Sequence, residues 1–540
     1  MSNEICDTNR LPLGQSGFSN IRNRGKIYVD KTKIISKIAE QDTPLFLSRP
    51  RRFGKSLLIN TLQSLFEKGL EDFHGLDIEK IWSDSTYKVV HIDFSRMIDN
   101  DIHSINYTLS NKIIQQFKED NHTIQFPEKM LQYPDIILDE ILQKLDDYST
   151  VLLIDEYDAP LTHHINEKAL LQDITTCLSK FYATIKQYTD KFRFIFITGI
   201  TRVSHVSVFS AFNNLVDLSL DDDYNDLLGF TQNDLIRYFD PYIGNASQIL
   251  NMSKNDVYLR LEQYYDGFQF SPEARETVYN PWSILSFLKL SKNGFKNYWF
   301  ESGGTPSLIM QYIKKNTDFD FIDYDKRNIE IDKNKLSRKY EISDIPQYIL
   351  LYQAGYYTIR RKEDGKTYLV LPNEEVEESL LLLYIEENSL FLSSDITAKM
   401  YKISKYIDEK NLFQITDIFN SILNECVSIL SNIFNDERSV RDIIYAALIK
   451  IPSIQKIKER ETVKGRSDLE LITEKTCMII EFKRINSRLG PEAALRKALE
   501  QLKMNRYGLL FSESHALYRV GMVISTEEKM ILHDFCKEAL

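Results

Sequence analysis

The sequence predicts an α/β protein of several domains, and three observations indicate this fold class. Apolar segments of strand length alternate with segments of helical periodicity over roughly the first 225 residues. A helix-rich middle follows and contains one hairpin pattern, and two strand-like segments joined by a polar turn stand near the C-terminus. At about 150 residues per domain, the 540 residues have room for about three or four domains. We place them at residues 1–225, 226–335, 336–425 and 426–540.

The segment Arg49–Ser56 carries the first chemical signal. It reads Arg-Pro-Arg-Arg-Phe-Gly-Lys-Ser and lies between a short apolar segment, Pro44–Ser48, and a segment with leucines at helical spacing. In such a strand-loop-helix unit, glycine lets the backbone approach a phosphate, lysine reaches the β and γ oxygens, and serine ligates Mg²⁺. The pattern predicts that ATP or GTP is bound by Arg52, Phe53, Gly54, Lys55, Ser56 and Leu57.

Two considerations weigh against this prediction. The consensus phosphate-binding loop opens with glycine at the position that Arg49 occupies, which predicts a variant loop and argues against ordinary turnover. For Gly-Lys-Ser alone, an equally weighted alternative is the start of a surface helix with a solvated Lys55.

A second apolar segment, Val151–Ile154, ends in Asp155 and Glu156. This pattern resembles a Walker B strand, in which the aspartate holds Mg²⁺, directly or through water, and the glutamate polarises the water that attacks the γ-phosphate. The alternative is a buried strand whose terminal acids cap the next helix. Because both motifs occur in one chain, we favour a nucleotide site over either alternative.

Two further strand candidates extend this region. Lys88–Phe94 lies between the two motifs, and Phe192–Ile197 follows them and leads to Thr198. A strand inserted between the motifs resembles the additional-strand P-loop ATPases, which include the AAA+ proteins. The resemblance implies that Thr198 is a polar sensor beside the γ-phosphate. Arg202 is placed to contact a phosphate in its own site or in a neighbouring subunit, and only the second role requires a homo-oligomer. An equally weighted alternative for Arg202 is a surface arginine paired with a carboxylate.

Composition fits a globular cytoplasmic protein. The chain is 43% hydrophobic and 27% charged, and no apolar run approaches the ~18 residues of a membrane span. The first residues lack a signal-peptide pattern. The scattered cysteines disfavour disulfides and zinc; they are Cys6, Cys177, Cys426, Cys477 and Cys536. A net charge of −11 means that any nucleic acid would need a local basic patch.

The middle of the chain carries less chemistry. Thr231 is expected to cap a helix, and helices are expected to about residue 315. Aromatic residues in the turns 264–268 and 279–283 are candidates for base stacking, but filling a core beneath a turn is the favoured alternative. Segments 355–360 and 367–371 flank an Asp-Gly turn and predict a hairpin, which suggests a winged-helix-like domain.

The segment from Gly465 to Lys483 carries the second chemical signal. Two strands joined by a turn centred between Glu474 and Lys475 would pair Ile472 with Cys477 and, counting outward, Asp468 with Glu481. Like charges directly opposite on a sheet are destabilising, so a cation is the simplest reason to keep both acids there. Glu481 and Lys483 project from the same face, and the set suits a divalent ion such as Mg²⁺. A slip of one residue would separate the acids.

This constellation resembles the PD-(D/E)XK nuclease superfamily. The resemblance implies phosphodiester hydrolysis in which Asp468 and Glu481 are metal ligands and Lys483 positions or activates a water. Glu437 and Glu461 are candidate auxiliary ligands. Gln501 and Tyr507 match the helix that supports this core, since residues 493–502 have a helical pattern. The alternative is that this Asp and this Glu-x-Lys lie on a solvated face of a sheet and have no catalytic role.

The whole chain resembles bacterial AAA-ATPase-like proteins with a C-terminal PD-(D/E)XK domain. The resemblance rests on residues 28–32, 49–57, 155–158, 213–214, 279–282, 372–374 and the final hairpin. In that family arginine is usual at the Arg49 position. The family implies an ATP-gated nuclease with ATP and Mg²⁺ as cofactors, with DNA favoured over RNA as partner, and, by association only, a role in defence or mobile-element biology. The main alternative is a nucleotide-dependent switch or scaffold that binds without cutting; a translocating motor is a third.

Overall fold

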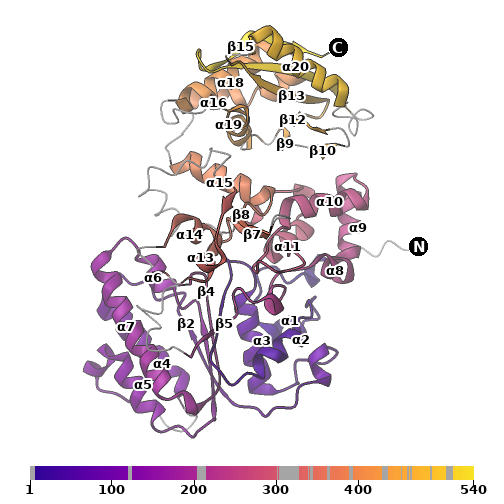
Figure 1. Cartoon of the computed structure of the whole chain (residues 1–540). Helices are drawn as coiled ribbons and strands as arrows, with labels where there is room; N and C mark the ends of the chain where they lie inside the picture. Colours follow the sequence, from indigo (N-terminus) through magenta and orange to yellow (C-terminus); the bar gives the residue numbers. More distant parts are fainter. Residues whose placement is uncertain are drawn as a thin grey trace. The chain divides into compact units, whose positions relative to one another are not determined.

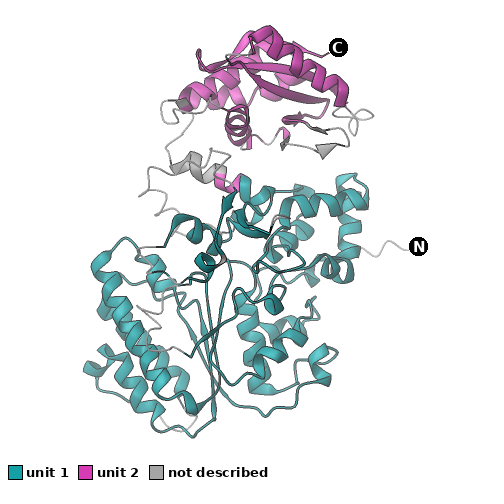
Figure 2. Ribbon diagram, in the orientation of Figure 1, with its two compact units in different colours: residues 1–317, 328–377 teal, residues 318–327, 378–540 magenta. Residues whose placement is uncertain are grey.

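A computed structural model of the chain shows two compact units (Figures 1 and 2). The first comprises residues 1–317 and 328–377, and the second comprises 318–327 and 378–540. The structure describes residues 7–118, 125–202, 214–300, 302, 328–338, 340, 345–361, 365–387, 393–427, 434, 436–449, 451, 453–458, 461–462, 465–486, 489–505 and 515–539.

The core of the first unit is a five-stranded sheet of order β2-β3-β4-β1-β5, in which each adjacent pair is parallel. Its strands are β1 (Leu45–Ser48), β2 (Lys88–Asp93), β3 (Thr150–Asp155), β4 (Phe192–Gly199) and β5 (Val216–Asp217). Strands β1, β3 and β4 are buried on both faces, as apolar runs in a parallel sheet predict. Because β4 separates β1 from β3, the loop after β1, the acids after β3 and the end of β4 meet at one edge.

Helices cover both faces of this sheet. Figure 1 shows α4, α5 and α7 on one side and α1, α2 and α3 on the other. These helices are α1 (Phe18–Asn23), α2 (Thr32–Ala39), α3 (Lys55–Lys68), α4 (Ile102–Phe117), α5 (Pro134–Leu142), α6 (Ala159–His163) and α7 (Lys168–Gln187). Short 3₁₀ turns lie at Thr8–Arg10, Asp77–Lys80, Glu128–Gln132, Thr189–Lys191, Asp222–Tyr224 and Ser291–Asn293.

A helical layer follows the sheet in the same unit. It contains α8 (Gln232–Asp234), a π-helical turn (Leu235–Phe239), α9 (Asp240–Leu250), α10 (Lys254–Tyr265) and α11 (Pro281–Lys289). Thr231 caps α8 in a capping box with Asp234, as expected. Tyr264, Tyr265 and Tyr279 are buried in the apolar core of this layer. They therefore fill a core, which was the favoured alternative to base stacking.

A small antiparallel sheet of order β6-β8-β7 completes the first unit. Its strands are β6 (Ile329–Glu330), β7 (Thr358–Arg361) and β8 (Thr367–Val370), and the helices beside it in sequence are α13 (Lys333–Ser337) and α14 (Gln347–Gln353). The predicted hairpin is present, with Thr358 opposite Val370. In the Asp-Gly turn of this hairpin, Gly365 has a φ of 79°, whereas Asp364 lies outside the described residues. The winged-helix assignment stays a prediction.

The second unit is built on a five-stranded sheet of order β15-β14-β13-β12-β9, in which only β13 and β14 run parallel. Its strands are β9 (Gln455–Lys458), β12 (Leu469–Ile472), β13 (Thr476–Arg484), β14 (Ala516–Ser525) and β15 (Met530–Glu538), and a separate pair is β10 (Glu461–Thr462) and β11 (Gly465–Arg466). The predicted pairing of Ile472 with Cys477 is confirmed and continues to Leu469 with Ile480.

Helix α20 packs on β13, β14 and β15, while α18 contacts β15 and α19 contacts β9 and β13. The helices of the C-terminal part are α15 (Glu374–Glu387), which crosses the limit between the units, α16 (Ser394–Met400), α17 (Ile403–Asp408), α18 (Leu412–Val427), α19 (Glu437–Ile449) and α20 (Pro491–Asn505). The four predicted domains stay a prediction; residues 393–425, assigned there to a linker, lie in the second unit. Among the helices that the structure describes, none is long and apolar enough to cross a bilayer.

Candidate functional site

The loop between β1 and α3 has a conformation that glycine permits. Gly54 has φ of 97°, in the left-handed region, and Lys55 is the first residue of α3. A Cβ atom at position 54 would meet no heavy atom within 4 Å. Gly54 therefore supplies a backbone conformation and leaves open space where an anion can approach the helix N-terminus.

Lys55 is buried, and the loop itself binds its ammonium group. Nζ donates to the carbonyl oxygens of Arg49 at 2.8 Å and Pro50 at 3.0 Å. Burial lowers the pKa of Lys55, while the carboxylates of Glu156 and Asp155 act in the opposite direction. The ammonium group thus lies at the base of the loop, within the field of the two acids that end β3.

Asp155 joins the loop to the neighbouring strand. Its Oδ2 accepts a hydrogen bond from Ser56 Oγ at 2.6 Å, and its Oδ1 accepts one from Thr198 Oγ1 at 2.5 Å. The serine expected to ligate a cation, the Walker B aspartate and the sensor candidate are therefore in contact. Oxygen donors of this kind fit Mg²⁺.

Glu156 occupies an unusual backbone position. Its φ is 52°, which costs a non-glycine residue about 1 kcal/mol. Burial raises the pKa of its carboxyl group, with contributions from Asp155 and Asp158, and Lys55 and Arg51 oppose the rise. A partly buried acid with a raised pKa, next to two cations, suits proton transfer from a water.

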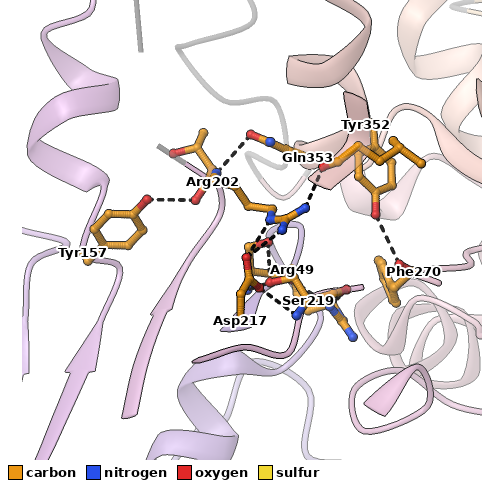
Figure 3. A network of polar contacts seen from close by, with 11 residues as sticks. Arg49, Tyr157, Arg202, Asp217, Ser219, Phe270, Tyr352 and Gln353 are labelled. Carbon is orange, nitrogen blue, oxygen red and sulfur yellow. Dashed lines mark hydrogen bonds and ion pairs between the residues drawn. The ribbon is translucent and has the colours of Figure 1, made fainter. Parts of the chain in front are cut away.

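Arg202 does not point at the phosphate loop. Its Nε and Nη2 donate to Asp217 Oδ2 at 2.9 and 2.7 Å, and Nη1 donates to the carbonyl of Leu336 at 2.7 Å (Figure 3). Its backbone N–H donates to Gln353. The structure therefore agrees with the alternative interpretation, in which Arg202 pairs with a carboxylate, but the pair is largely buried rather than on the surface.

Arg49 is likewise a structural residue. Its guanidinium group donates to the carbonyls of Ser48, Ser219 and Tyr224, each at 2.9 Å, and lies 4.2 Å from the centroid of the Phe270 ring. Burial lowers its pKa to about 10. The arginine that replaces the consensus glycine thus holds the start of the loop against the segments that contain Ser219 and Phe270 (Figure 3).

The other predicted loop residues contribute in different ways. Arg52 is exposed, lies over the Trp282 ring at 4.2 Å and donates to the carbonyl of Ser302 at 2.7 Å. The Phe53 side chain is buried against Phe268 and Phe270, so only its backbone is available to a nucleotide. Leu57 lies in the first turn of α3.

The second site lies where β12 approaches β13. Asp468 immediately precedes β12, and its Oδ2 accepts from the backbone N–H of Phe482 at 2.7 Å. Lys483 Nζ donates to Glu481 Oε1 at 2.6 Å and to the Phe482 carbonyl at 3.1 Å. The register thus brings together Asp468, Glu481 and Lys483, the three residues that the sequence analysis selected.

The electrostatics of this site favour a cation. Burial, followed by the Asp468 charge, raises the pKa of Glu481 to about 8, although Lys483 opposes the rise. Glu481 Oε2 is buried and has no hydrogen-bond partner among the described residues. Burial lowers the pKa of Lys483, but Glu481 and Asp468 outweigh it, so the net change is upward. A buried carboxylate oxygen without a hydrogen-bond donor, in the field of a second acid, is a group that a divalent cation would stabilise.

Glu437 also belongs to this site. Its Oε1 accepts from the backbone N–H of Arg484 at 2.6 Å, and burial and the Asp468 charge raise its pKa. Of the other candidates, Gln501 lies on α20, whereas the Glu461 side chain and Tyr507 lie outside the described residues. In the described part of the chain, no three His, Cys, Asp or Glu side chains form a ready-made metal cluster. Asp468 and Glu481 are therefore the core of the site, and a cation there would also take ligands from water or substrate.

The sequence analysis did not select Asp158 and Glu470, two buried acids near these sites, as site residues. Asp158 Oδ2 accepts from the backbone N–H and hydroxyl of Thr201, both at 2.6 Å, and so fixes the segment after β4. Glu470 is buried and accepts from Ser467 Oγ at 2.9 Å. The sequence pattern that could have revealed Glu470 is its position two residues after Asp468, because alternate residues of a strand share a face.

Two family models match the regions of the chain that contain these residues. A family model described as "Predicted AAA-ATPase" matches residues 12–209, which include the phosphate loop, β3 and Thr198. A model for the PD-(D/E)XK nuclease superfamily matches residues 435–534, which include Glu437, Asp468, Glu481 and Lys483.

One relative is similar along nearly the whole chain. It is described as "Uncharacterized protein in vnfD 5'region", from Azotobacter chroococcum mcd 1. The two are 27% identical over 535 residues, which cover 97% of this chain and 98% of the relative. The pairing of an AAA-ATPase-like region with a PD-(D/E)XK region is thus the architecture that the sequence analysis expected.

Proposed function

We propose that this chain, in which an AAA-ATPase-like region precedes a PD-(D/E)XK region, is an ATP-regulated, metal-dependent nuclease. The observation that carries the proposal is the register of β12 and β13. It brings Asp468 to the backbone of Phe482 while Lys483 contacts Glu481. Two acids and a lysine around one point are the groups that phosphodiester hydrolysis needs.

In the nuclease site each residue has a separate task. Asp468 and Glu481 would hold Mg²⁺, with Glu437 beside them, and the bound ion would supply charge neutralisation and a more acidic water. Lys483 is anchored by the Phe482 carbonyl and Glu481, so its remaining N–H can orient the attacking water or contact a phosphate oxygen.

In the nucleotide site Lys55, whose ammonium group is held by two loop carbonyls, would bind the β- and γ-phosphate oxygens of ATP. Ser56 and Asp155 would hold the Mg²⁺ that accompanies ATP, and Thr198 keeps Asp155 in position. Glu156 would accept the proton of the attacking water. We infer that nucleotide state controls cutting, since the same chain carries both sites.

A panel of nucleic acids tests the cleavage. Wild-type protein with Mg²⁺ is incubated with double-stranded DNA, single-stranded DNA and RNA, each with ATP, ADP, a non-hydrolysable ATP analogue or no nucleotide. We expect cleavage, preferentially of DNA, at a rate that depends on the nucleotide. Asp468→Ala should abolish it, and Glu156→Gln should hold the protein in its ATP-bound state and change the rate.

One observation favours a second function, a nucleotide-dependent switch or scaffold that binds without cutting. The raised pKa of Glu481 keeps this acid largely protonated at neutral pH when no cation is bound. A scaffold would bind nucleic acid or protein equally well after Asp468→Ala, whereas a nuclease would lose its activity. Absence of cleavage across the panel together with retained binding by Asp468→Ala would favour the scaffold.

A further inference from the structure

The phosphate loop contains three arginines, and the structure gives them different environments. Arg49 is buried and bound to three carbonyls. Arg52 lies over Trp282 and donates to Ser302. The guanidinium group of Arg51 makes no hydrogen bond or ion pair with any described residue. Arg51 is therefore the arginine of this loop whose side chain is available to a ligand.

Arg51 is nevertheless held in place by its backbone. Its carbonyl oxygen accepts a hydrogen bond from Trp299 Nε1 at 3.3 Å, and Trp299 is completely buried. The preceding residue, Pro50, packs closely against Gly355. A Cβ atom added to Gly355 would lie 2.7 Å from the Cβ of Pro50. The loop backbone is thus fixed on both sides of a side chain that is only half-buried.

The Arg51 side chain also lies in the field of the catalytic groups. It acts on the Glu156 carboxyl group in the same direction as Lys55, by favouring its charged form. It also disfavours the charged form of Lys55. Lys55 and Arg51 thus lie near the same carboxylate, where both cations can act on a triphosphate bound beside it.

We propose that Arg51 contacts the γ-phosphate of ATP within its own subunit and stabilises the charge that develops there during hydrolysis. This inference rests on the proposed ATPase function. In the step concerned, water oxygen forms a bond to the γ-phosphorus and its proton passes to Glu156. The bond from the γ-phosphorus to the β–γ bridging oxygen breaks, and ADP leaves with the electron pair. A planar guanidinium group can donate two hydrogen bonds to the transferred phosphoryl group.

Arg202 is not available for this role. Arg202 is occupied by Asp217 and the Leu336 carbonyl, so it cannot turn to a phosphate without breaking a buried ion pair. With Arg51 in the loop itself, no neighbouring subunit is needed to complete the site. Turnover per subunit should therefore be independent of assembly.

The test compares Arg51→Ala with a control, Arg24→Ala, which removes an exposed arginine at the C-terminal end of α1. ATP affinity is measured by titration, and hydrolysis by single turnover at saturating ATP. We expect Arg51→Ala to lower the single-turnover rate about 100-fold or more, with ATP affinity changed much less. Arg51→Lys should keep part of the rate, since it retains the charge but lacks the planar fork. Arg24→Ala should match wild type.

Mixing two inactive variants tests whether Arg51 acts within its subunit. Lys55→Ala keeps Arg51, and Arg51→Ala keeps Lys55, so activity that returns on mixing would show action across an interface. We expect no recovery. Recovery on mixing, a wild-type rate in Arg51→Ala, or a loss confined to ATP affinity would each overturn the inference. Failure of wild-type protein to bind ATP would instead overturn the proposed function, and it is measured before any variant.

Discussion

Divalent-cation binding at the second site should depend steeply on pH, because Glu481 must lose a proton first. Burial and the neighbouring Asp468 charge raise the pKa of Glu481 to about 8, whereas Glu474, in the turn of the same hairpin, is exposed. With a pKa of about 8, about one-tenth of the Glu481 side chains are ionised at pH 7 and about one-hundredth at pH 6. Cation affinity should therefore rise about tenfold per pH unit up to pH 8 and level off above it.

Calorimetric titration with Ca²⁺ between pH 6 and pH 9 measures this dependence, and buffers of different ionisation enthalpy count the protons released. Close to one proton per ion should leave at pH 7. Glu481→Gln should remove the pH dependence together with most of the affinity, while Glu474→Gln should behave as wild type. Affinity that stays constant from pH 6 to pH 9 would refute the reasoning.

The same ionisation affects folding in the absence of metal. Because the pKa of Glu481 is higher in the folded protein than in an unfolded chain, its contribution to stability is fully present below about pH 4.5 and is lost as pH rises through about 8. Between pH 6 and pH 9 the free energy of unfolding should fall by up to about 2–3 kcal/mol. Denaturant unfolding of metal-free protein measures the fall, and Glu481→Gln should abolish it.

Three further predictions concern the nucleotide site. Arg202→Ala leaves the largely buried Asp217 without its cation and should cost about 3–5 kcal/mol of stability in denaturant unfolding; an unchanged midpoint would contradict its structural role. Gly54→Ala forces alanine into a φ of 97° and should cost about 1–2 kcal/mol and weaken ATP binding, although the added methyl group meets nothing within 4 Å. Ser56→Ala removes the 2.6 Å hydrogen bond to Asp155 and should weaken ATP binding in Mg²⁺ but much less in EDTA; equal effects in both would argue against a cation ligand.

Local patterns were sufficient to predict β1, β3 and β4 and the hairpin that carries Asp468, Glu481 and Lys483. The apolar runs that became β1, β3 and β4 are buried on both faces, so their composition alone marked them. The C-terminal hairpin was predictable because the turn at Glu474 and Lys475 fixes the register, and the register determines that Asp468 approaches β13.

The roles of the arginines were not predictable from local patterns. Arg202 is bound by Asp217, Leu336 and Gln353, which lie 15, 134 and 151 residues away in sequence. Such partners come together only through tertiary packing, so spacing cannot reveal them. For the same reason the sequence could not show that Arg51, alone among the loop arginines, keeps a side chain without a partner in the described structure.

The most direct test of the account is nucleotide-dependent cleavage by Lys483→Ala, with Lys475→Ala as its matched control. Lys483 donates to Glu481 inside the site, whereas Lys475 is exposed in the turn of the same hairpin. Labelled DNA is incubated with Mg²⁺ and with ATP, ADP or a non-hydrolysable analogue, and ATP binding is measured in parallel. We predict that Lys483→Ala binds ATP as wild type does but cleaves nothing, while Lys475→Ala cleaves normally. Cleavage by Lys483→Ala at the wild-type rate would contradict the assignment of this site.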